Sequence, residues 1–307
     1  MLAIRYRAVG RALDEPASYP APDVGPVDGA LRVYFARRDE AGRSRAHFVP
    51  LDPGDPLRRL GPVAPAGLEL GPPGTFDADG HAPRCVVEAA DGARLLYLIG
   101  WNRAQSVPYH LAIGRARSLD GGRTWDKLPG PVLDRSADEP FLCTSPCVLL
   151  DGDTYRMWYC GGTGWEEHDG RAEPLYRVHH AESADGVRWR RTPHVCVDAF
   201  SGGDAIGWPS VWKEAGGYRM LFSYRARSGF RDDPDRAYRT GYATSVDGLA
   251  WEVRLDEFRL DRSEEGWDSV MAAYATPRGG HLFYNGNGFG RTGIGVARRA
   301  DFADNSA

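Results

Sequence analysis

The chain has 307 residues, of which 42% are apolar and 11% aromatic, so it is long enough to bury a large core. Its formal net charge of −4 excludes a basic footprint for nucleic acid or for an anionic membrane surface. No run approaches 18 apolar residues, and the first ten residues lack the apolar core of a signal peptide, so we expect a cytoplasmic protein. Five cysteines, an odd number, predict buried free thiols and no disulfide framework.

Short apolar or alternating runs follow one another along the whole chain, and no segment has a helical period. Residues 2–7 alternate and predict a strand, whereas residues 10–30 are rich in Pro and Gly and predict a loop. The further predicted strands are 31–36, 45–50, 84–89, 93–99, 109–118, 147–150, 155–160, 175–183, 210–213, 218–224, 238–245, 271–275, 281–285 and 293–298, with short ones at Trp125, Trp189 and Trp251.

One motif occurs three times, as SLDGGRTW at 118–125, SADGVRW at 183–189 and SVDGLAW at 245–251. In each copy the Asp accepts backbone N–H bonds, the Gly allows a positive φ, and the Trp buries a large ring directly after the turn. The motif therefore predicts a hairpin turn that is made three times. We interpret its aspartates, Asp120, Asp185 and Asp247, as structural.

The spacing of prolines follows the same period, because Pro83, Pro146 and Pro209 are each 63 residues apart. Extending the period reaches Pro22 in one direction and Met271 in the other, which makes five units of about 62 residues. Four strands per unit in meander order predict an all-β protein, a single five-bladed β-propeller over residues 1–307. The last unit offers three strands, and the strand at 2–7 is expected to complete it.

A meander also predicts which loops share a face of the propeller. The three repeated turns fall on the outer rim, and the long loops and the connections between units fall around the opposite mouth. Those segments carry carboxylates, arginines, tryptophans and asparagines, which are residue types that bind sugars. We expect the substrate to contact Arg38, Asp39, His81, Trp101, Asn102, Trp165, Arg225, Tyr284 and Asn285.

These motifs carry a resemblance to a known class of proteins. The repeated S-x-D-G-x-x-W, the GTFDADG at 74–80, the YFARRD at 34–39, and GWDS at 266–269 followed by FYNGN at 283–287 resemble five-bladed propellers related to the arabinanase, invertase and mannoside-phosphorylase glycosidases. The invertase-type Asn-Asp-Pro-Asn-Gly motif is absent. The resemblance covers nearly the whole chain and implies a glycoside hydrolase or a related glycosyl-transferring enzyme.

In such enzymes two carboxylates flank an anomeric carbon. The resemblance assigns the catalytic acids to Asp77 or Asp79, to Glu139 and to Asp268, while Asp39 is the substitute for a base missing from unit 1. Two alternatives stay open, namely a non-hydrolytic step of sugar or natural-product biosynthesis, and a non-catalytic sugar-binding propeller.

We expect a small-molecule or oligosaccharide substrate, no cofactor, no metal, and no nucleic-acid or membrane partner. The sequence GFGRTG at 288–293 matches G-x-G-x-x-G, but a strand follows it, so it does not predict dinucleotide binding. His179 and His180 should point to opposite faces of one strand. The sugar, the linkage and the oligomeric state are left open.

Overall fold

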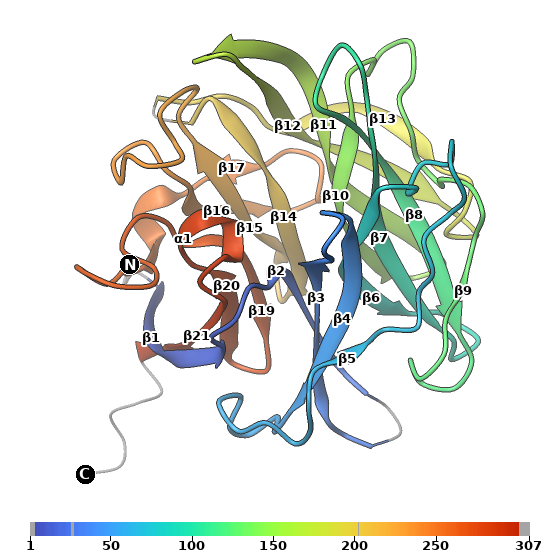
Figure 1. Ribbon diagram of the computed structural model, residues 1–307, viewed down its shortest axis with the longest axis horizontal. Helices are drawn as coiled ribbons and strands as arrows, with labels where there is room; N and C mark the ends of the chain where they lie inside the picture. The colour runs from blue at the N-terminus through green and yellow to red at the C-terminus, as the bar shows by residue number, and fades with distance from the viewer. Residues whose placement is uncertain (1–3, 26–27, 202, 301–307) are drawn as a thin grey trace.

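The computed structural model describes residues 4–25, 28–201 and 203–300. Within these ranges the regular structure is nearly all β, and the helices are one 3-10 turn, η1 (Leu255–Glu257), and the four-residue α1 (Asn287–Gly290). No described helix is long and apolar enough to cross a membrane. The strands follow one another around the molecule, so that the red C-terminal strands return beside the blue N-terminal ones (Figure 1).

The strands form four hydrogen-bonded sheets. The largest contains β2 (Ser18–Val24), β3 (Leu31–Arg38), β4 (Ser44–Leu51), β6 (Gly80–Glu88), β7 (Arg94–Arg103), β8 (Tyr109–Ser118) and β9 (Asp126–Lys127), with β5 (Ala64–Pro65) beside β4. The next two contain β10 (Cys143–Asp151), β11 (Thr154–His168), β12 (Arg171–Ser183) and β13 (Arg190–Val197), and then β14 (Ala205–Glu214), β15 (Gly217–Arg225), β16 (Arg239–Ser245) and β17 (Glu252–Val253). The last contains β18 (Phe258–Leu260), β1 (Ile4–Leu13), β21 (Ile294–Arg299), β20 (His281–Asn285) and β19 (Ala273–Arg278), in that order. A single parallel bridge, Ser44 to Gly80, joins the two halves of the largest sheet.

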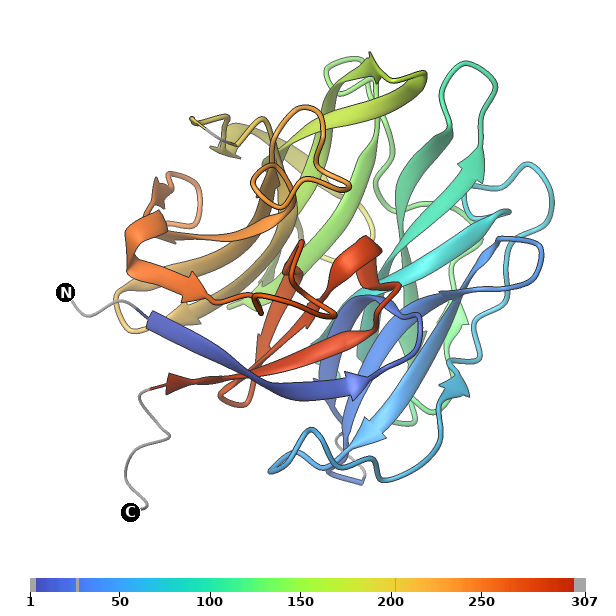
Figure 2. The same ribbon diagram turned by 60° about the vertical axis from the view of Figure 1, so that its left-hand side comes forward.

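The two ends of the chain meet in the last sheet. Strand β1 pairs antiparallel with β21, with Tyr6 opposite Arg299 and Arg7 opposite Arg298, which confirms the predicted pairing of the N-terminal strand with the last unit. Figure 2 shows the blue β1 crossing in front of the red strands. Residues 301–307 and 1–3 lie outside the described part of the chain.

The predicted loop at 10–30 is wrong, because β1 extends to Leu13 and β2 occupies Ser18–Val24. The prolines of this segment misled the prediction. They are tolerated because β2 is an edge strand that pairs with β3 alone, and an edge strand does not need every N–H for its ladder.

The repeated turns have the expected construction. The carboxylate of Asp247 accepts hydrogen bonds from the backbone N–H groups of Leu249 and Ala250 at 2.8 and 2.9 Å, and Gly248 has a φ of 77°. These two N–H groups hold the pKa of Asp247 below its usual value. The equivalent carboxylates of Asp120 and Asp185 accept bonds in the same way, so the structural interpretation of the three aspartates is supported.

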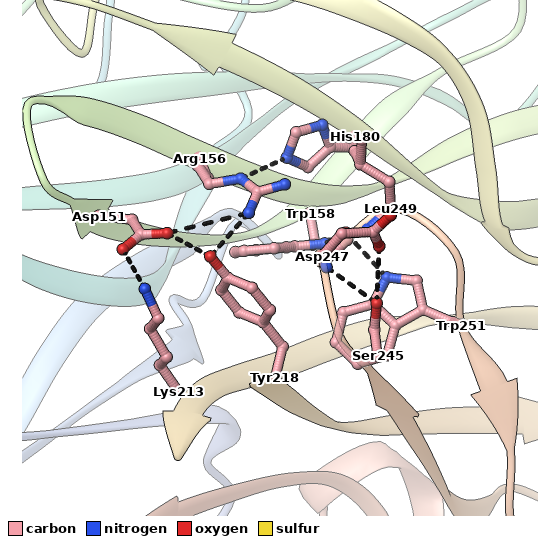
Figure 3. A network of polar contacts seen from close by, with 11 residues as sticks. Asp151, Arg156, Trp158, His180, Lys213, Tyr218, Ser245, Asp247, Leu249 and Trp251 are labelled. Carbon is pink, nitrogen blue, oxygen red and sulfur yellow. Dashed lines mark hydrogen bonds and ion pairs between the residues drawn. The ribbon is translucent and has the colours of Figure 1, made fainter. Parts of the chain in front are cut away.

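Each turn also docks on the preceding unit. The carbonyl of Gly248 accepts a hydrogen bond from Trp158 Nε1 of β11 at 2.8 Å, and the rings of Trp158 and Trp251 meet edge to face (Figure 3). Gly186 accepts from Tyr97 of β7 at 2.9 Å in the same manner. The repeated motif therefore closes its own hairpin and also joins neighbouring sheets.

The three tryptophans of the motif differ in burial. Trp125 is buried, at 9% exposure, whereas Trp189 and Trp251 are half-buried, which corrects the prediction that all three are largely buried. Both half-buried rings still pack against the cores that lie between neighbouring sheets.

Two smaller predictions concern cysteine and histidine. All five cysteines are free, and four of them are buried, as expected. His180 is completely buried beside Arg156 of β11, while His179 on the other face of β12 is half-buried, so the two rings do point to opposite faces.

Candidate functional site

The inner ends of the sheets surround a cavity of about 870 Å³, which we call the mouth cavity. Every sheet contributes to its lining. Its residues from the strands nearest the centre are Tyr19 of β2, Ala82 of β6, Thr144 of β10, Trp208 of β14 and Tyr274 of β19. None of the three Asp-Gly turns lines it, in agreement with the predicted division between rim and mouth.

A second hollow of about 1010 Å³ is larger than the mouth cavity. It lies on the outer side between two sheets, where Trp212 of β14 and Tyr242 of β16 face Tyr6 of β1. Because only those two sheets line it, it is a groove between neighbours. We take the mouth cavity as the candidate site, since all the sheets converge on it.

Three aromatic rings pack together in the lining of the mouth cavity, and we call them the aromatic floor. Trp208 stacks on Tyr274 with ring centroids 4.5 Å apart, and Tyr19 lies 5.1 Å from Tyr274. All three residues have positive φ, at 63°, 52° and 61° for Tyr19, Trp208 and Tyr274. Such a backbone costs about 1–3 kcal/mol for each residue, and strain of this kind collects at functional sites.

A β-bulge produces each of these conformations. The register shifts between Ser18 and Ala21 on β2, and equivalent shifts occur on β14 and β19. Each bulge turns one backbone N–H away from the ladder, and a side chain accepts it. The acceptors are Asn285 Oδ1 for Tyr19 at 2.7 Å, Cys160 Sγ for Trp208 at 3.0 Å and Ser223 Oγ for Tyr274 at 2.9 Å. The bulged backbone and these three hydrogen bonds to side chains therefore hold the residues of the aromatic floor in place.

One wall of the cavity is a buried cluster around Arg225 of β15, which is 1% exposed. Its guanidinium donates to Pro174 O at 2.7 Å and to the Tyr238 hydroxyl at 3.2 Å, and it lies 3.7 Å from the centre of the Phe230 ring. The hydroxyls of Tyr176 and Tyr238 are hydrogen-bonded to each other. Burial raises the pKa of Tyr176 well above its usual value, so its hydroxyl stays neutral.

The rim of the cavity carries further arginines. Arg37 pairs with Glu15 at 2.5 Å, and Arg231 pairs with Glu173 at 2.7 Å. These two glutamates are the only carboxylates among the described lining residues.

Two rim arginines make no ion pair within the described part of the chain. Arg38 donates to Gly42 O at 2.6 Å and lies 5.2 Å above the Trp101 ring. Arg291 follows the α1 turn and contacts no carboxylate among the described residues. Both side chains are exposed, so their guanidinium groups are available to a ligand.

Of the substrate-contacting residues predicted from sequence, the cavity brings together Arg38, Trp101 and Arg225. Asn285 does not line the cavity. It is completely buried, and its side chain accepts the hydrogen bond from the backbone N–H of the lining residue Tyr19. Trp165 packs edge to face on Tyr109, a lining residue, at 5.3 Å.

The remaining predicted contacts are elsewhere in the fold. Asp39 pairs with Arg43 at 3.0 Å on the hairpin after β3. His81 and Tyr284 are completely buried, and Asn102 lies on β7 opposite His110. None of these four lines the cavity.

The four predicted catalytic carboxylates also lie off the cavity lining. Asp77 and Asp268 are completely buried, and Glu139 is 8% exposed. Asp77 pairs with Lys127 of β9, and Asp79 pairs with Arg103 of β7 at 3.2 Å. Burial acts to raise the pKa of Asp77, but His81 and Lys127 outweigh it and lower that pKa, which is the direction opposite to that of a general acid.

The other two carboxylates face their own sheets. Glu139 accepts from the Tyr159 hydroxyl at 2.6 Å and pairs with Arg191 of β13 at 3.1 Å. Asp268 accepts from the Tyr284 hydroxyl at 2.8 Å and from the backbone of Ser263 at 3.2 Å. Each carboxylate therefore bonds the segment that connects two units to the sheet that follows this segment. The catalytic role of both residues remains a prediction.

The aromatic floor was missed from the sequence, although a signal was present. The residue with positive φ directly precedes a proline in Tyr19-Pro20, Ser145-Pro146 and Trp208-Pro209. Two of these prolines, Pro146 and Pro209, belong to the period that located the units, so that period also marks two of the residues with positive φ. The GFGRTG segment gave a second signal, because Gly288, Phe289 and Gly290 line the cavity.

Several solved structures with a similar fold are described as glycoside hydrolases. The protein superposes on one described as a glycoside hydrolase with a TM-score of 0.72 and 18% identity, over 96% of this chain and 92% of that one. A structure from a study of GH130 mannoside phosphorylases and glycoside hydrolases gives 0.63 and 18%, over 92% and 84%. A thermostable family-43 glycoside hydrolase gives 0.63 and 15%, over 92% and 88%. The protein therefore has a glycosidase-like propeller fold.

At the level of sequence, no family model matches the chain. Two proteins of Mycobacterium tuberculosis, the uncharacterized proteins MT1551 and Rv1502, are each 37% identical to it over 290 residues, which is 92% of this chain and 91% of theirs. Identity of this extent over nearly the whole length of both partners shows common descent. The chain belongs to the family of MT1551 and Rv1502.

Proposed function

We propose that residues 1–307 form one five-bladed propeller that binds a carbohydrate in the mouth cavity. The blade count is supported by the five meanders, of which the first two are joined by the single Ser44 to Gly80 bridge. It is also supported by β1, which completes the last meander from the other end of the chain. A ring closed in this way brings the inner strands of all blades to one axis.

The observation that carries the proposal is the lining of the mouth cavity. Nine aromatic residues and five arginines line this cavity, and together they come from every sheet. Flat rings stack on the C–H faces of a sugar ring, and guanidinium groups donate directional hydrogen bonds to hydroxyls. Half-buried Tyr19, Trp101 and Trp208 present such faces.

The charge of the lining favours a sugar that bears an anionic group. Five arginines line the cavity against two glutamates, and both glutamates are already paired. Arg38 and Arg291 are left to bind a carboxylate or a phosphate, which guanidinium recognises through two parallel hydrogen bonds. We therefore propose a uronic acid, a sugar phosphate or a conjugate of one of these as the ligand class.

Among carbohydrate-active roles, a non-hydrolytic one is favoured. Hydrolysis by two carboxylates requires both to reach the anomeric carbon. Glu15 and Glu173 line the cavity but are paired with arginines, and the four carboxylates predicted from sequence are bonded to their own sheets. A transferring, rearranging or purely binding propeller does not need that pair at the mouth. Paired-carboxylate hydrolysis through Asp77 or Asp79, Glu139 and Asp268 is the competing proposal.

The ligand class is tested by removing the two unpaired arginines. We expect R38M and R291M each to weaken binding of glucuronate and of glucose 6-phosphate by roughly tenfold to a hundredfold, because a charge-assisted hydrogen bond contributes about 1.5–3 kcal/mol. Binding of neutral glucose should change little. Isothermal titration with these three probes measures the effect, and R188M, which removes an arginine on the outer Asp185 turn, is the control.

Equal affinity of the wild type for glucose and for glucuronate would contradict an anionic ligand while leaving sugar binding intact. No binding of any of the three probes, together with none for the disaccharides that contain them, would contradict the proposed function itself. Glucuronate and glucose 6-phosphate separate the carboxylate and phosphate forms of the ligand class.

A further inference from the structure

Arg84 is a buried cation without an anion. It lies on β6, two residues beyond the cavity-lining Ala82, and it is 2% exposed. Its Nε and Nη1 have no hydrogen-bond partner among the described residues, and its Nη2 lies 3.5 Å from Pro209 O, at the outer limit of a hydrogen bond. No described carboxylate lies within ion-pair distance of it, although the chain pairs most of its other buried arginines.

The groups around Arg84 cannot supply the missing negative charge. Its ionisable neighbours are the thiols of Cys85, Cys147 and Cys160 and the phenol of Tyr19. Burial raises the pKa of the Cys160 thiol to about 11, although the Trp208 amide, the Ser145 hydroxyl and Arg84 act in the opposite direction. At neutral pH these groups are uncharged.

A buried hydroxyl lies beside the same thiol. Ser145 is completely buried on the bulge of β10, with a φ of 52°, and among the described residues its Oγ contacts no hydrogen-bonding group other than the weakly accepting Cys160 thiol. Ser145 follows Thr144, which pairs with Cys160 of β11. Cys160 Sγ accepts from the Trp208 N–H, and Arg84 lies 3.5 Å from Pro209 O, so Arg84 and the β10 bulge meet at the same bulge of β14.

An isolated charge in such a place is costly. Removing a guanidinium from water without a counter-charge is strongly unfavourable, and arginine does not avoid this cost by losing its proton. The remaining solutions are ordered water or a small anion. An anion satisfies the charge as well as the unused donors, which water alone does not.

We propose that Arg84 and Ser145 hold a small inorganic anion of the size of chloride between β6, β10 and the bulge of β14. The site is separate from the mouth cavity and does not depend on the sugar proposed there. Because Pro209 and Tyr19 contact or adjoin Arg84, a bound anion stabilises the bulges that carry the floor. The fold is therefore expected to be more stable in chloride than without it.

The test is thermal unfolding at fixed ionic strength, with sodium gluconate replaced stepwise by sodium chloride or bromide. We expect the Tm of the wild type to rise by a few degrees and to saturate, since an anion that binds the folded state alone stabilises it by mass action. R84M should lose the halide dependence. The double variant R38M/R291M should keep it, which separates this site from the mouth cavity.

A wild-type Tm that does not respond to halide, or an R84M variant that responds like the wild type, would overturn the proposal. If R84M does not fold, a crystal of the wild type soaked in bromide decides. An anomalous peak within hydrogen-bond distance of the Arg84 guanidinium supports the site, and its absence there contradicts it.

Discussion

Replacement of Trp125 by alanine is expected to lower the free energy of unfolding by about 3–5 kcal/mol and to leave ligand binding at the mouth unchanged. The ring is 9% exposed and meets Tyr34 of the preceding unit edge to face, with centroids 6.1 Å apart. Removing the ring leaves a cavity where two neighbouring units now pack against each other. Trp251→Ala should cost less, because Trp251 is half-buried.

Urea unfolding followed by circular dichroism measures this effect, and Leu119→Ala in the same turn is the control, because Leu119 is 78% exposed. The opposite pattern, with stability retained and binding of glucuronate lost, would mean that the repeated turns belong to the ligand site. The assignment of rim and mouth would then be reversed.

Glu139→Gln is expected to destabilise the fold by about 2–3 kcal/mol while ligand binding is retained. The substitution leaves Arg191 without its partner, and breaking a largely buried ion pair costs more than the pair contributes. Glu139 also fixes Tyr159 of β11, so its contacts are those of a group that holds a connection onto a sheet.

The matched control is Glu182→Gln, which breaks the exposed pair of Glu182 with Arg190 at 2.6 Å and should cost under about 1 kcal/mol. Unfolding in urea and titration with glucuronate, performed on both variants, separate the possibilities. If Glu139→Gln keeps its stability and its affinity but loses turnover of the true substrate, Glu139 is a catalytic carboxylate and the hydrolytic proposal is restored.

The fold could be predicted to a large extent because its information is local and repeated. An Asp that caps a turn, a Gly with positive φ and a Trp after the turn act within eight residues, and the motif at 118–125 recurs at a constant spacing. The pairing of β1 with β21 followed from counting strands, since the last unit lacked one. The strand β2 was missed because proline normally ends a strand, and only its place at an edge permits it.

The site was harder to predict because it depends on the direction of side chains at bulges. A bulge moves one residue across the pleat, so alternation along β14 does not reveal that Trp208 enters the centre. The carboxylates mislead for a related reason. Asp268 belongs to a connection that was predicted to lie at the mouth, but its carboxylate accepts a hydrogen bond from Tyr284 of the sheet that follows it.

The most direct test of the account is a crystal structure of the protein soaked with glucuronate or glucose 6-phosphate. We predict electron density for the sugar in the mouth cavity, with the ring against Trp101 or Trp208 and the anionic group against Arg38 or Arg291. Density in the groove between Trp212 and Tyr242 instead, with an empty mouth cavity, would contradict it.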